Sequence, residues 1–366
     1  MTKLRVAVLS VVAAVFGLAI AHMAFRPQAV AQERTVLEIW SATDREAIEP
    51  VIQRFEALNP SIDIDYTEFN TAELYKAVLD ADHLPDLVMS SSMDLQVDLV
   101  NAGYAAPVDD VPETPGWSRW RDELFGFTRE PVALVYDREA FAGRDLPVSR
   151  SDLAGMLRDD PAFFEGRVGT YDVTVSGVGY MFATQDAQRG YQASRLVESL
   201  GRAHARLYCC TGEMIDDIAS GDLVLAYNVI GSYANRMVAD NPRLSLLLLR
   251  DYALVFTRSV FVTRSADHPS EAKSFVRFLL SPEGQSTLRD ESSLDPVGSE
   301  DPVETGVLAS QLSGGAALLP IRLRPDLLTW LDDRKKQRFL KDWKASMTGV
   351  EPGDGKDIRS QVSERP

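Results

Sequence analysis

The sequence is built from short apolar segments, each followed by a polar turn and an amphipathic helix. In the first unit, 36–40 read as a strand, Ser41 and Thr43 lie in the turn, and the apolar residues of 46–58 recur at helical spacing. Further strands are predicted at 62–66, 86–89, 131–136, 167–171, 206–208 and 223–228. Repeated strand–helix units predict an α/β fold with mostly parallel sheets and right-handed crossovers.

The amino-terminal segment 1–31 has the form of an export signal. Two basic residues precede an apolar run over 6–25, and Ala29-Val30-Ala31 has the small-x-small pattern of a cleavage site. We expect cleavage after Ala31 and a periplasmic protein. The run is also long enough to span a bilayer, so an uncleaved anchor is the alternative.

The acidity of the chain argues against nucleic acid as a partner. Cleavage would remove three positive charges and no negative one, which moves the formal charge from −16 to about −19. Nucleic-acid binding needs clustered positive charge that releases counterions. The acidity therefore indicates a soluble, self-repelling surface and identifies no ligand.

The size of the chain predicts two domains. After cleavage about 335 residues remain, and 45% of the whole sequence is hydrophobic, which is more than a single core usually accommodates. The tail 349–366 is rich in Gly, Pro, Ser and charge without apolar periodicity. We expect this tail to be disordered.

Hydroxyl side chains gather where predicted strands of the first half end. Ser90, Ser91 and Ser92 lie between a buried strand and a helix that starts at Met93. A helix N-terminus attracts anions through its unpaired N–H groups and its dipole. The alternative is ordinary helix capping, which Ser92 alone could provide. Ser41 and Thr43 repeat the arrangement, and ligands of open α/β sheets bind at such strand ends.

Polar groups occupy comparable places in the second half. The candidates there are Thr174, Ser176, Thr211, Tyr227, Asn228, Ser232 and Tyr233. The Gly-rich stretch 174–180 is predicted to be a turn that leads into a helix, and its glycines beside Ser176 would let a ligand approach the backbone closely. A tyrosine such as Tyr227 is slightly more often part of the core. The recurrence of such loops predicts one shared ligand cleft.

Arg129 and the two cysteines each allow two interpretations. Arg129 could bind an anion in bidentate fashion, or it could form a surface salt bridge. Cys209 and Cys210 are the only cysteines. They could form a vicinal disulfide in an oxidising periplasm, but a bridge between neighbours closes a tight ring, so we expect two thiols.

Nothing in the sequence points to catalysis or to a metal. The histidines after the signal segment, His83, His204 and His268, have no metal-ligand spacing. A nucleophile elbow, a phosphate loop and zinc-protease spacing are all missing from the sequence. We therefore expect no enzyme, no cofactor and no metal site, with a hydrolase as the weaker class.

Four segments together resemble the type II periplasmic substrate-binding proteins of ABC importers. They are 84–91, 133–137, 219–228 and 268–285. This family of extracellular solute-binding proteins includes ferric-iron, thiamine and sugar-phosphate binders. The resemblance implies a monomer with two α/β lobes that are joined by two hinge strands and close on a ligand in a central cleft.

The resemblance also implies boundaries for the two lobes. Lobe one would comprise 32–131 and 254–320, and lobe two 132–253, with a predicted helix over 325–347 as a candidate addition to lobe two. The crossings between lobes are expected near 132–136 and 252–256.

The ligand implied by the resemblance is a small polar organic molecule. Iron-binding members carry a histidine in the first loop, a glutamate after the strand that corresponds to 87–88, and two adjacent tyrosines. Here the matching places hold Asp44, Ser91 and 228–233, which contains no tyrosine pair. Ferric iron is therefore disfavoured, and a sugar phosphate or small carboxylate, delivered to an ABC permease, fits better. An exported sensor that reports to a membrane histidine kinase is the alternative.

Overall fold

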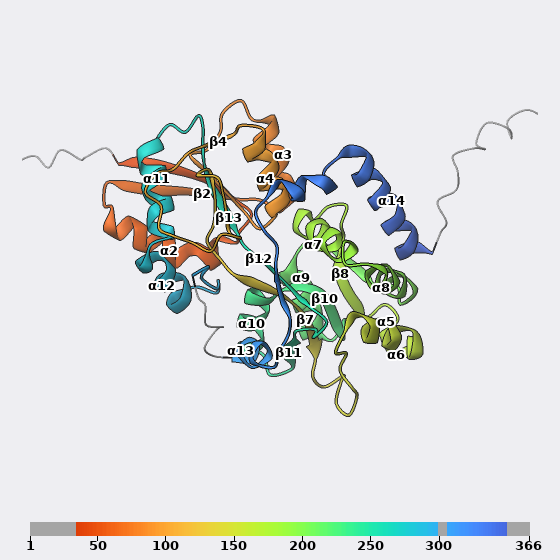
Figure 1. The fold of residues 1–366 in the computed structure, drawn as a ribbon. Helices are drawn as coiled ribbons and strands as arrows, with labels where there is room; N and C mark the ends of the chain where they lie inside the picture. Colours follow the sequence, from red (N-terminus) through yellow and green to blue (C-terminus); the bar gives the residue numbers. More distant parts are fainter. Residues whose placement is uncertain (1–33, 299–305, 350–366) are drawn as a thin grey trace, which may run out of the picture. The chain divides into compact units, whose positions relative to one another are not determined.

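Two seven-stranded sheets carry the fold in a computed structural model that describes residues 34–298 and 306–349 (Figure 1). The expected signal segment 1–31 lies outside the described residues, and so does all of the expected tail except Gly349. Among the described residues, no helix is both long and apolar enough to cross a membrane.

The first sheet is built mainly from the amino-terminal third of the chain. Its strands run in the order β2 (Ile62–Glu68), β1 (Thr35–Ser41), β3 (Leu87–Ser90), β13 (Ser259–Thr263), β6 (Leu124–Gly126) and β5 (Arg119–Trp120), and β4 (Ala105–Ala106) pairs with β13. Its helices are α2 (Arg45–Leu58), α3 (Thr71–Asp80), α4 (Met93–Asn101), α11 (Pro269–Leu279) and α12 (Pro282–Glu291). The predicted apolar face of α2 is buried, and its Phe55 packs edge-on against Phe275 of α11.

The second sheet collects the middle of the chain and one late strand. The order is β14 (Leu318–Pro320), β12 (Ala253–Phe256), β7 (Glu130–Asp137), β10 (Leu225–Ile230), β8 (Val168–Tyr171) and β9 (Arg206–Tyr208), and β11 (Leu244–Leu247) pairs with β7. Its helices are α5 (Arg150–Asp159), α6 (Pro161–Phe164), α7 (Gly177–Ala187), α8 (Tyr191–Arg202), α9 (Thr211–Ser220), α10 (Gly231–Asp240), α13 (Gly306–Ser313) and α14 (Asp333–Thr348).

Both sheets are mixed, which corrects the expectation of mostly parallel sheets. β1 pairs with β3 and β8 pairs with β9 and β10 in parallel, but β13 is antiparallel to β3, β4 and β6, and β7 is antiparallel to β10, β11 and β12. The reason is that β7 and β13 each enter their sheet from the other one. They start at the edge where the parallel strands end, as the pairing of Ser259 with Ser90 shows.

The chain crosses between the sheets slightly outside the strands where we expected it. The crossings are 127–129, between β6 and β7, and 257–258, between β12 and β13, and they are joined side by side. Phe127 N donates to Arg258 O at 2.9 Å, and Arg258 N donates to Thr128 Oγ1 at 2.7 Å. A further connection, from α12 to α13, passes through 299–305, outside the described residues.

The segment 254–320 is divided between the sheets, whereas we expected all of it in lobe one. β13, α11 and α12 join the first sheet, but β12 and β14 are strands of the second. The physical reason is pairing: β12 lies between β7 and β14, and α13 packs on α10 and β11.

Two helical predictions also change in detail. The Gly-rich stretch 174–180 was expected as a turn, yet α7 begins at Gly177 and includes Gly179. A Cβ atom at Gly179 would lie 2.4 Å from Tyr171 Cβ, so glycine permits close packing of this helix. The predicted helix 325–347 is split into a 3₁₀ turn, η1 (Pro325–Trp330), which packs on α4, and α14, which packs on α8.

Candidate functional site

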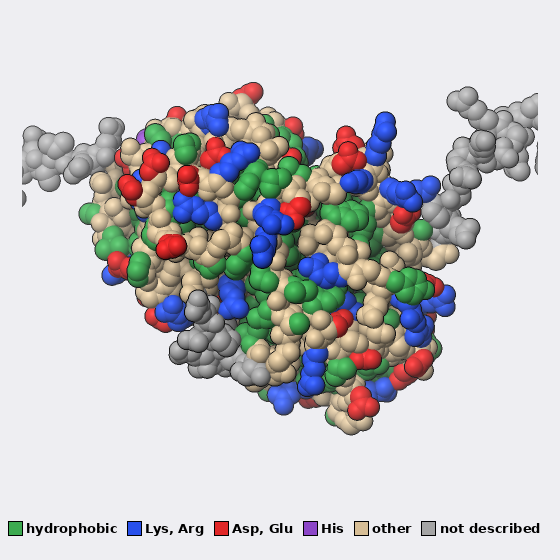
Figure 2. All heavy atoms as spheres, in the orientation of Figure 1, with side chains coloured by type: hydrophobic (Ala, Val, Ile, Leu, Met, Phe, Trp, Pro, Cys, Tyr) green, Lys and Arg blue, Asp and Glu red, His purple; other side chains and the backbone are tan. Residues whose placement is uncertain are grey.

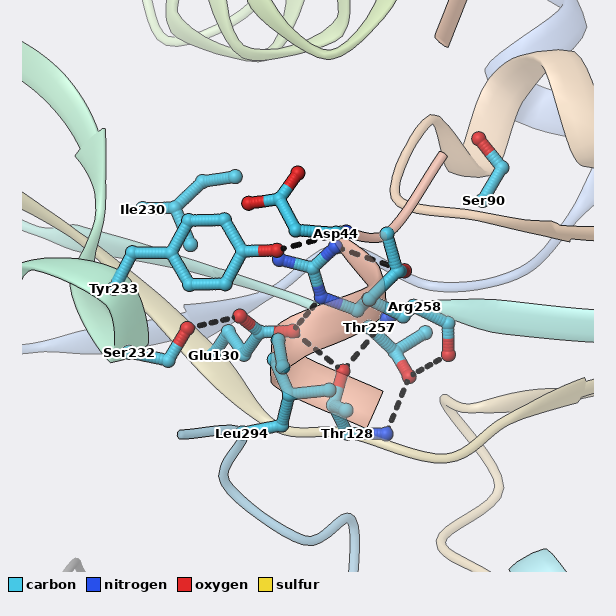
Figure 3. A network of polar contacts seen from close by, with 12 residues as sticks. Asp44, Ser90, Thr128, Glu130, Ile230, Ser232, Tyr233, Thr257, Arg258 and Leu294 are labelled. Carbon is cyan, nitrogen blue, oxygen red and sulfur yellow. Dashed lines mark hydrogen bonds and ion pairs between the residues drawn. The ribbon is translucent and has the colours of Figure 1, made fainter. Parts of the chain in front are cut away.

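Polar side chains from both sheets converge at the paired crossings (Figure 3). β1 and β3 of the first sheet end here, and so does β10 of the second, which is followed by Ser232 and Tyr233 on α10. This is the position at which open α/β sheets bind ligands, outside the carboxyl ends of parallel strands.

Arg258 lies at the centre of this cluster. Its side chain is 1% exposed, its Nε donates to Glu130 Oε1 at 2.9 Å, and its Nη1 donates to Thr43 Oγ1 at 3.0 Å. The guanidinium carbon also lies 4.8 Å from the centre of the Tyr233 ring. One arginine on a crossing thus links the first loop, the hinge and α10.

The guanidinium is not fully satisfied. Nη2 of Arg258 is buried and has no hydrogen-bond partner among the described residues. An unpaired buried donor costs about 1–3 kcal/mol, so a ligand oxygen that accepted from Nη2 would recover that free energy.

Glu130, in contrast, has its acceptors filled. It is fully buried and accepts from Arg258, from Thr128 Oγ1 at 2.8 Å and from Ser232 Oγ. Burial alone would lower the pKa of Arg258, but Glu130, Tyr233 and Asp44 together outweigh burial and raise this pKa. Arg258 and Glu130 form an ion pair, in which the positive charge of one side chain offsets the negative charge of the other.

Asp44 stands at the rim of the cluster with a free carboxylate. It is exposed and precedes α2, but its side chain does not cap that helix. Its backbone N–H donates to Tyr233 Oη at 3.4 Å, and Figure 3 shows its carboxylate above the Tyr233 ring. Burial raises the pKa of Tyr233, and the Asp44 charge adds to the rise.

The three serines after β3 are buried and differ in their partners. Ser90 Oγ accepts from Ser92 N at 3.1 Å, and Ser92 Oγ donates to Asp94 Oδ1 at 2.9 Å rather than capping α4. Ser91 as a residue is 2% exposed, and its hydroxyl has no hydrogen-bond partner in the described part of the chain. Burial raises the pKa of Asp94 to about 6.

The loops at the edge of the second sheet contact the first-sheet side directly. Ser176 caps α7 by accepting from Gly179 N at 3.2 Å. The first amides of α7, Gly177 N and Val178 N, donate to Thr71 Oγ1 of α3 at 2.9 and 3.2 Å. A threonine from the opposite side therefore occupies the helix N-terminus where a ligand was expected.

Two further candidates lie on this edge. Thr211 bonds to the Tyr171 hydroxyl and accepts from Ile230 N at 3.4 Å, which ties α9 to the ends of β8 and β10. Thr174 is exposed, and its hydroxyl donates to Asp172 at 2.6 Å.

Tyr227 and Asn228 belong to a separate network within the second sheet. Tyr227 Oη accepts from Arg150 at 2.7 Å and donates to Asp186 at 2.7 Å, and Asn228 donates to the same carboxylate at 3.0 Å. Both residues line a cavity of about 200 Å³ beneath α14. The structure does not bring them to Arg258.

Arg129 and the cysteines also differ from expectation. Arg129 is half-buried and is the last residue of the first crossing, where its backbone N–H donates to Asp295 O at 3.0 Å. Cys209 and Cys210 form a vicinal disulfide, which corrects the prediction of two thiols. The pair occupies the connection from β9 to α9, outside regular helix or strand, where the backbone can accommodate the ring.

Sequence reasoning missed Arg258 and Glu130 as site residues. A signal was present, because Arg258 interrupts the apolar run 253–262, and charged residues are almost never fully buried unless they are paired. Among the described residues, no group of three or more His, Cys, Asp or Glu side chains is arranged to hold a metal.

Two sheets joined at paired crossings, with polar side chains from both sides meeting there, define the class of two-lobed solute-binding proteins. Residues 37–291 match the model of the bacterial extracellular solute-binding protein family, and the chain belongs to that family. It is a substrate-binding protein of the ABC-transporter type and not an enzyme. Among curated proteins, none matches this sequence significantly.

Solved structures support the same fold. The substrate-binding protein of an ABC transporter from Agrobacterium tumefaciens is similar with a TM-score of 0.81 and 28% identity, over 87% of this chain and 96% of that one. Iron-bound HitA from Pseudomonas aeruginosa gives 0.67 and 19%, over 85% and 99%. AfuA from Actinobacillus pleuropneumoniae, with fructose-6-phosphate bound, gives 0.66 and 15%, over 86% and 99%.

Proposed function

We propose that this protein is exported to the periplasm, captures a small polar organic ligand with an acidic group at the Arg258 cluster, and delivers it as a monomer to an ABC permease of the inner membrane. The observation that carries the ligand class is the unpaired, buried Nη2 of Arg258, which lies between loops of both sheets. A phosphate or carboxylate oxygen is its natural acceptor.

Contacts between the two sides support a closure mechanism. Thr71 caps α7 from across the cleft, the Asp44 N–H meets Tyr233, and Arg236 of α10 pairs with Glu46 of α2 at 3.3 Å. These contacts exist only when the sides meet, so a ligand that touches both sides stabilises the closed form. A permease would then recognise that form.

Ferric iron is not proposed as the ligand. The first loop offers Asp44, the loop after β3 offers Ser91, and no tyrosine pair follows β10. The likeness to HitA, at 19% identity, concerns the fold.

Mass spectrometry of the protein purified under native conditions tests the proposal. We expect the chain from residue 32 to release a small organic acid on denaturation, and to become more compact in X-ray scattering when that molecule is added back. A protein that retains no solute, and that no fraction of a small-molecule extract compacts or stabilises, would contradict the proposed function.

A further inference from the structure

The charges around Arg258 do not favour a ligand that is only anionic. This inference rests on the proposed function, because it concerns the ligand of the same site. Arg258 and Glu130 form a buried ion pair at 2.9 Å, so together they contribute no net charge. The charge left over at the rim is that of Asp44, and it is negative.

The Asp44 carboxylate is available to a ligand. It makes no hydrogen bond or ion pair with the described residues, although it occupies the N-cap position of α2, where an aspartate commonly bonds to the helix. Figure 3 shows it on the open side of the network, next to the aromatic ring of Tyr233. A carboxylate beside an aromatic face is suited to an ammonium group.

The opposite preference holds at Arg258 and in the loop between β3 and α4. Nη2 of Arg258 is a buried, unpaired donor among the described residues, and the Ser91 hydroxyl makes no hydrogen bond with them. α4 begins directly after Ser92 without a side-chain cap. These groups suit an acidic group, because helix N–H groups and a guanidinium both favour negative charge.

We infer that the ligand is a zwitterion, which pairs an ammonium group with Asp44 and a phosphate or carboxylate with Arg258 Nη2, Ser91 and the N-terminus of α4. A zwitterion leaves every charge of the site matched. A pure anion would place a second negative charge beside Asp44, and a pure cation would leave Nη2 of Arg258 unpaired.

Matched probes separate these three ligand types. The sample for calorimetry is the chain from residue 32, freed of endogenous ligand. The first series compares O-phosphoethanolamine with ethyl phosphate and with ethanolamine. The second series compares β-alanine with propionate. In at least one of these two series, we expect the zwitterion to bind at least tenfold more tightly than its relatives that lack one charge.

The variant Asp44→Asn adds a second readout. It should weaken the preferred zwitterion by tenfold or more and leave ethyl phosphate or propionate unchanged or tighter, because only the ammonium contact is lost. Asp80→Asn is the matched control, since Asp80 is exposed at the far end of α3 and should change neither affinity.

Several results would overturn the inference. They are equal or tighter binding of the anion, no binding in either series, an unaffected Asp44→Asn, or recovery of a native ligand without an amine. The last result would leave the proposed function standing, because a ligand would still have been captured. Failure of the proposed function instead appears as the lack of any retained or compacting solute.

Discussion

At the scale of single residues, Arg258 combines a buried ion pair with an unpaired donor. Its ion pair with Glu130 is buried at a crossing, and its remaining nitrogen is unpaired within the described structure. A buried pair is weak evidence for stability as such, but removal of one partner leaves an uncompensated charge and is costly. The sequence alone could not reveal this pair, because its two members are 128 positions apart.

We therefore expect Glu130→Gln to lower the free energy of unfolding by about 3 kcal/mol, the range seen when one partner of a buried pair is lost. Urea denaturation at neutral pH measures the change. Glu123→Gln, in the more exposed pair with Arg121, is the control and should cost less than about 1 kcal/mol. Equal effects for the two variants would show that the buried pair has no special role.

Asp295 predicts a pH dependence of stability. Burial, and secondarily the nearby Glu130 charge, raise its pKa from 3.8 to about 7. The folded protein then binds this proton more tightly than the unfolded chain, so stability falls as the pH rises from about 4 to about 7. Asp295→Asn should flatten this decline by about 2–4 kcal/mol.

Thermal unfolding at several pH values checks the slope, and Asp290→Asn, at an exposed position on α12, should leave the slope unchanged. A variant that keeps the full decline would mean that other carboxyl groups are responsible for it.

At the scale of elements, α7 shows why the predicted site was only partly right. Its N-terminus has the hydroxyl and glycines that the sequence suggested, but Thr71 of α3 fills it. Local patterns located several helices and strands, for example the strand predicted at 223–228, which the structure has as β10 at Leu225–Ile230. Local patterns could not predict which residue a loop contacts, because residues such as Thr71 and Gly177 are brought together only by the tertiary fold.

Thr71→Val should weaken ligand binding about 5- to 30-fold, because the amides of Gly177 and Val178 lose their acceptor when the cleft closes, a loss of about 1–2 kcal/mol. Calorimetry with the recovered ligand measures this change. Thr67→Val, at an exposed position on β2, keeps the same change of side chain and should have no effect. Unchanged affinity in Thr71→Val would exclude this contact from closure.

At the scale of the whole described chain, the carboxyl-terminal segment touches both sides of the cleft. β14 extends the second sheet, η1 packs on α4 and α14 packs on α8 (Figure 1). The sequence predicted one helix here and could not show that its two parts serve different sides. On the face drawn in Figure 2, acidic and basic side chains are interspersed, which fits a soluble binding protein more than a nucleic-acid binder.

Because η1 packs on α4 of one side and leads into α14 on the other, Leu327→Ala should speed both ligand association and release while changing the dissociation constant less than about threefold. Leu327 is 5% exposed, so the variant also costs about 2–4 kcal/mol in stability. Stopped-flow fluorescence measures the rates. Leu319→Ala, on β14 at 37% exposure, is the control, and unchanged rates in Leu327→Ala would show that η1 does not restrain opening.

The place of Arg258 has a consequence for how such a protein can change its ligand over evolution. The residue that would bind the acidic group of the ligand also stabilises the crossing between the sheets. A substitution of Arg258 therefore alters both ligand binding and the stability of the crossing. Asp44 in the first loop does not stabilise the crossing, since it is exposed and its carboxylate has no partner in the described structure. New ligand preferences should therefore arise by substitution at position 44, while Arg258 is retained and continues to bind the acidic group.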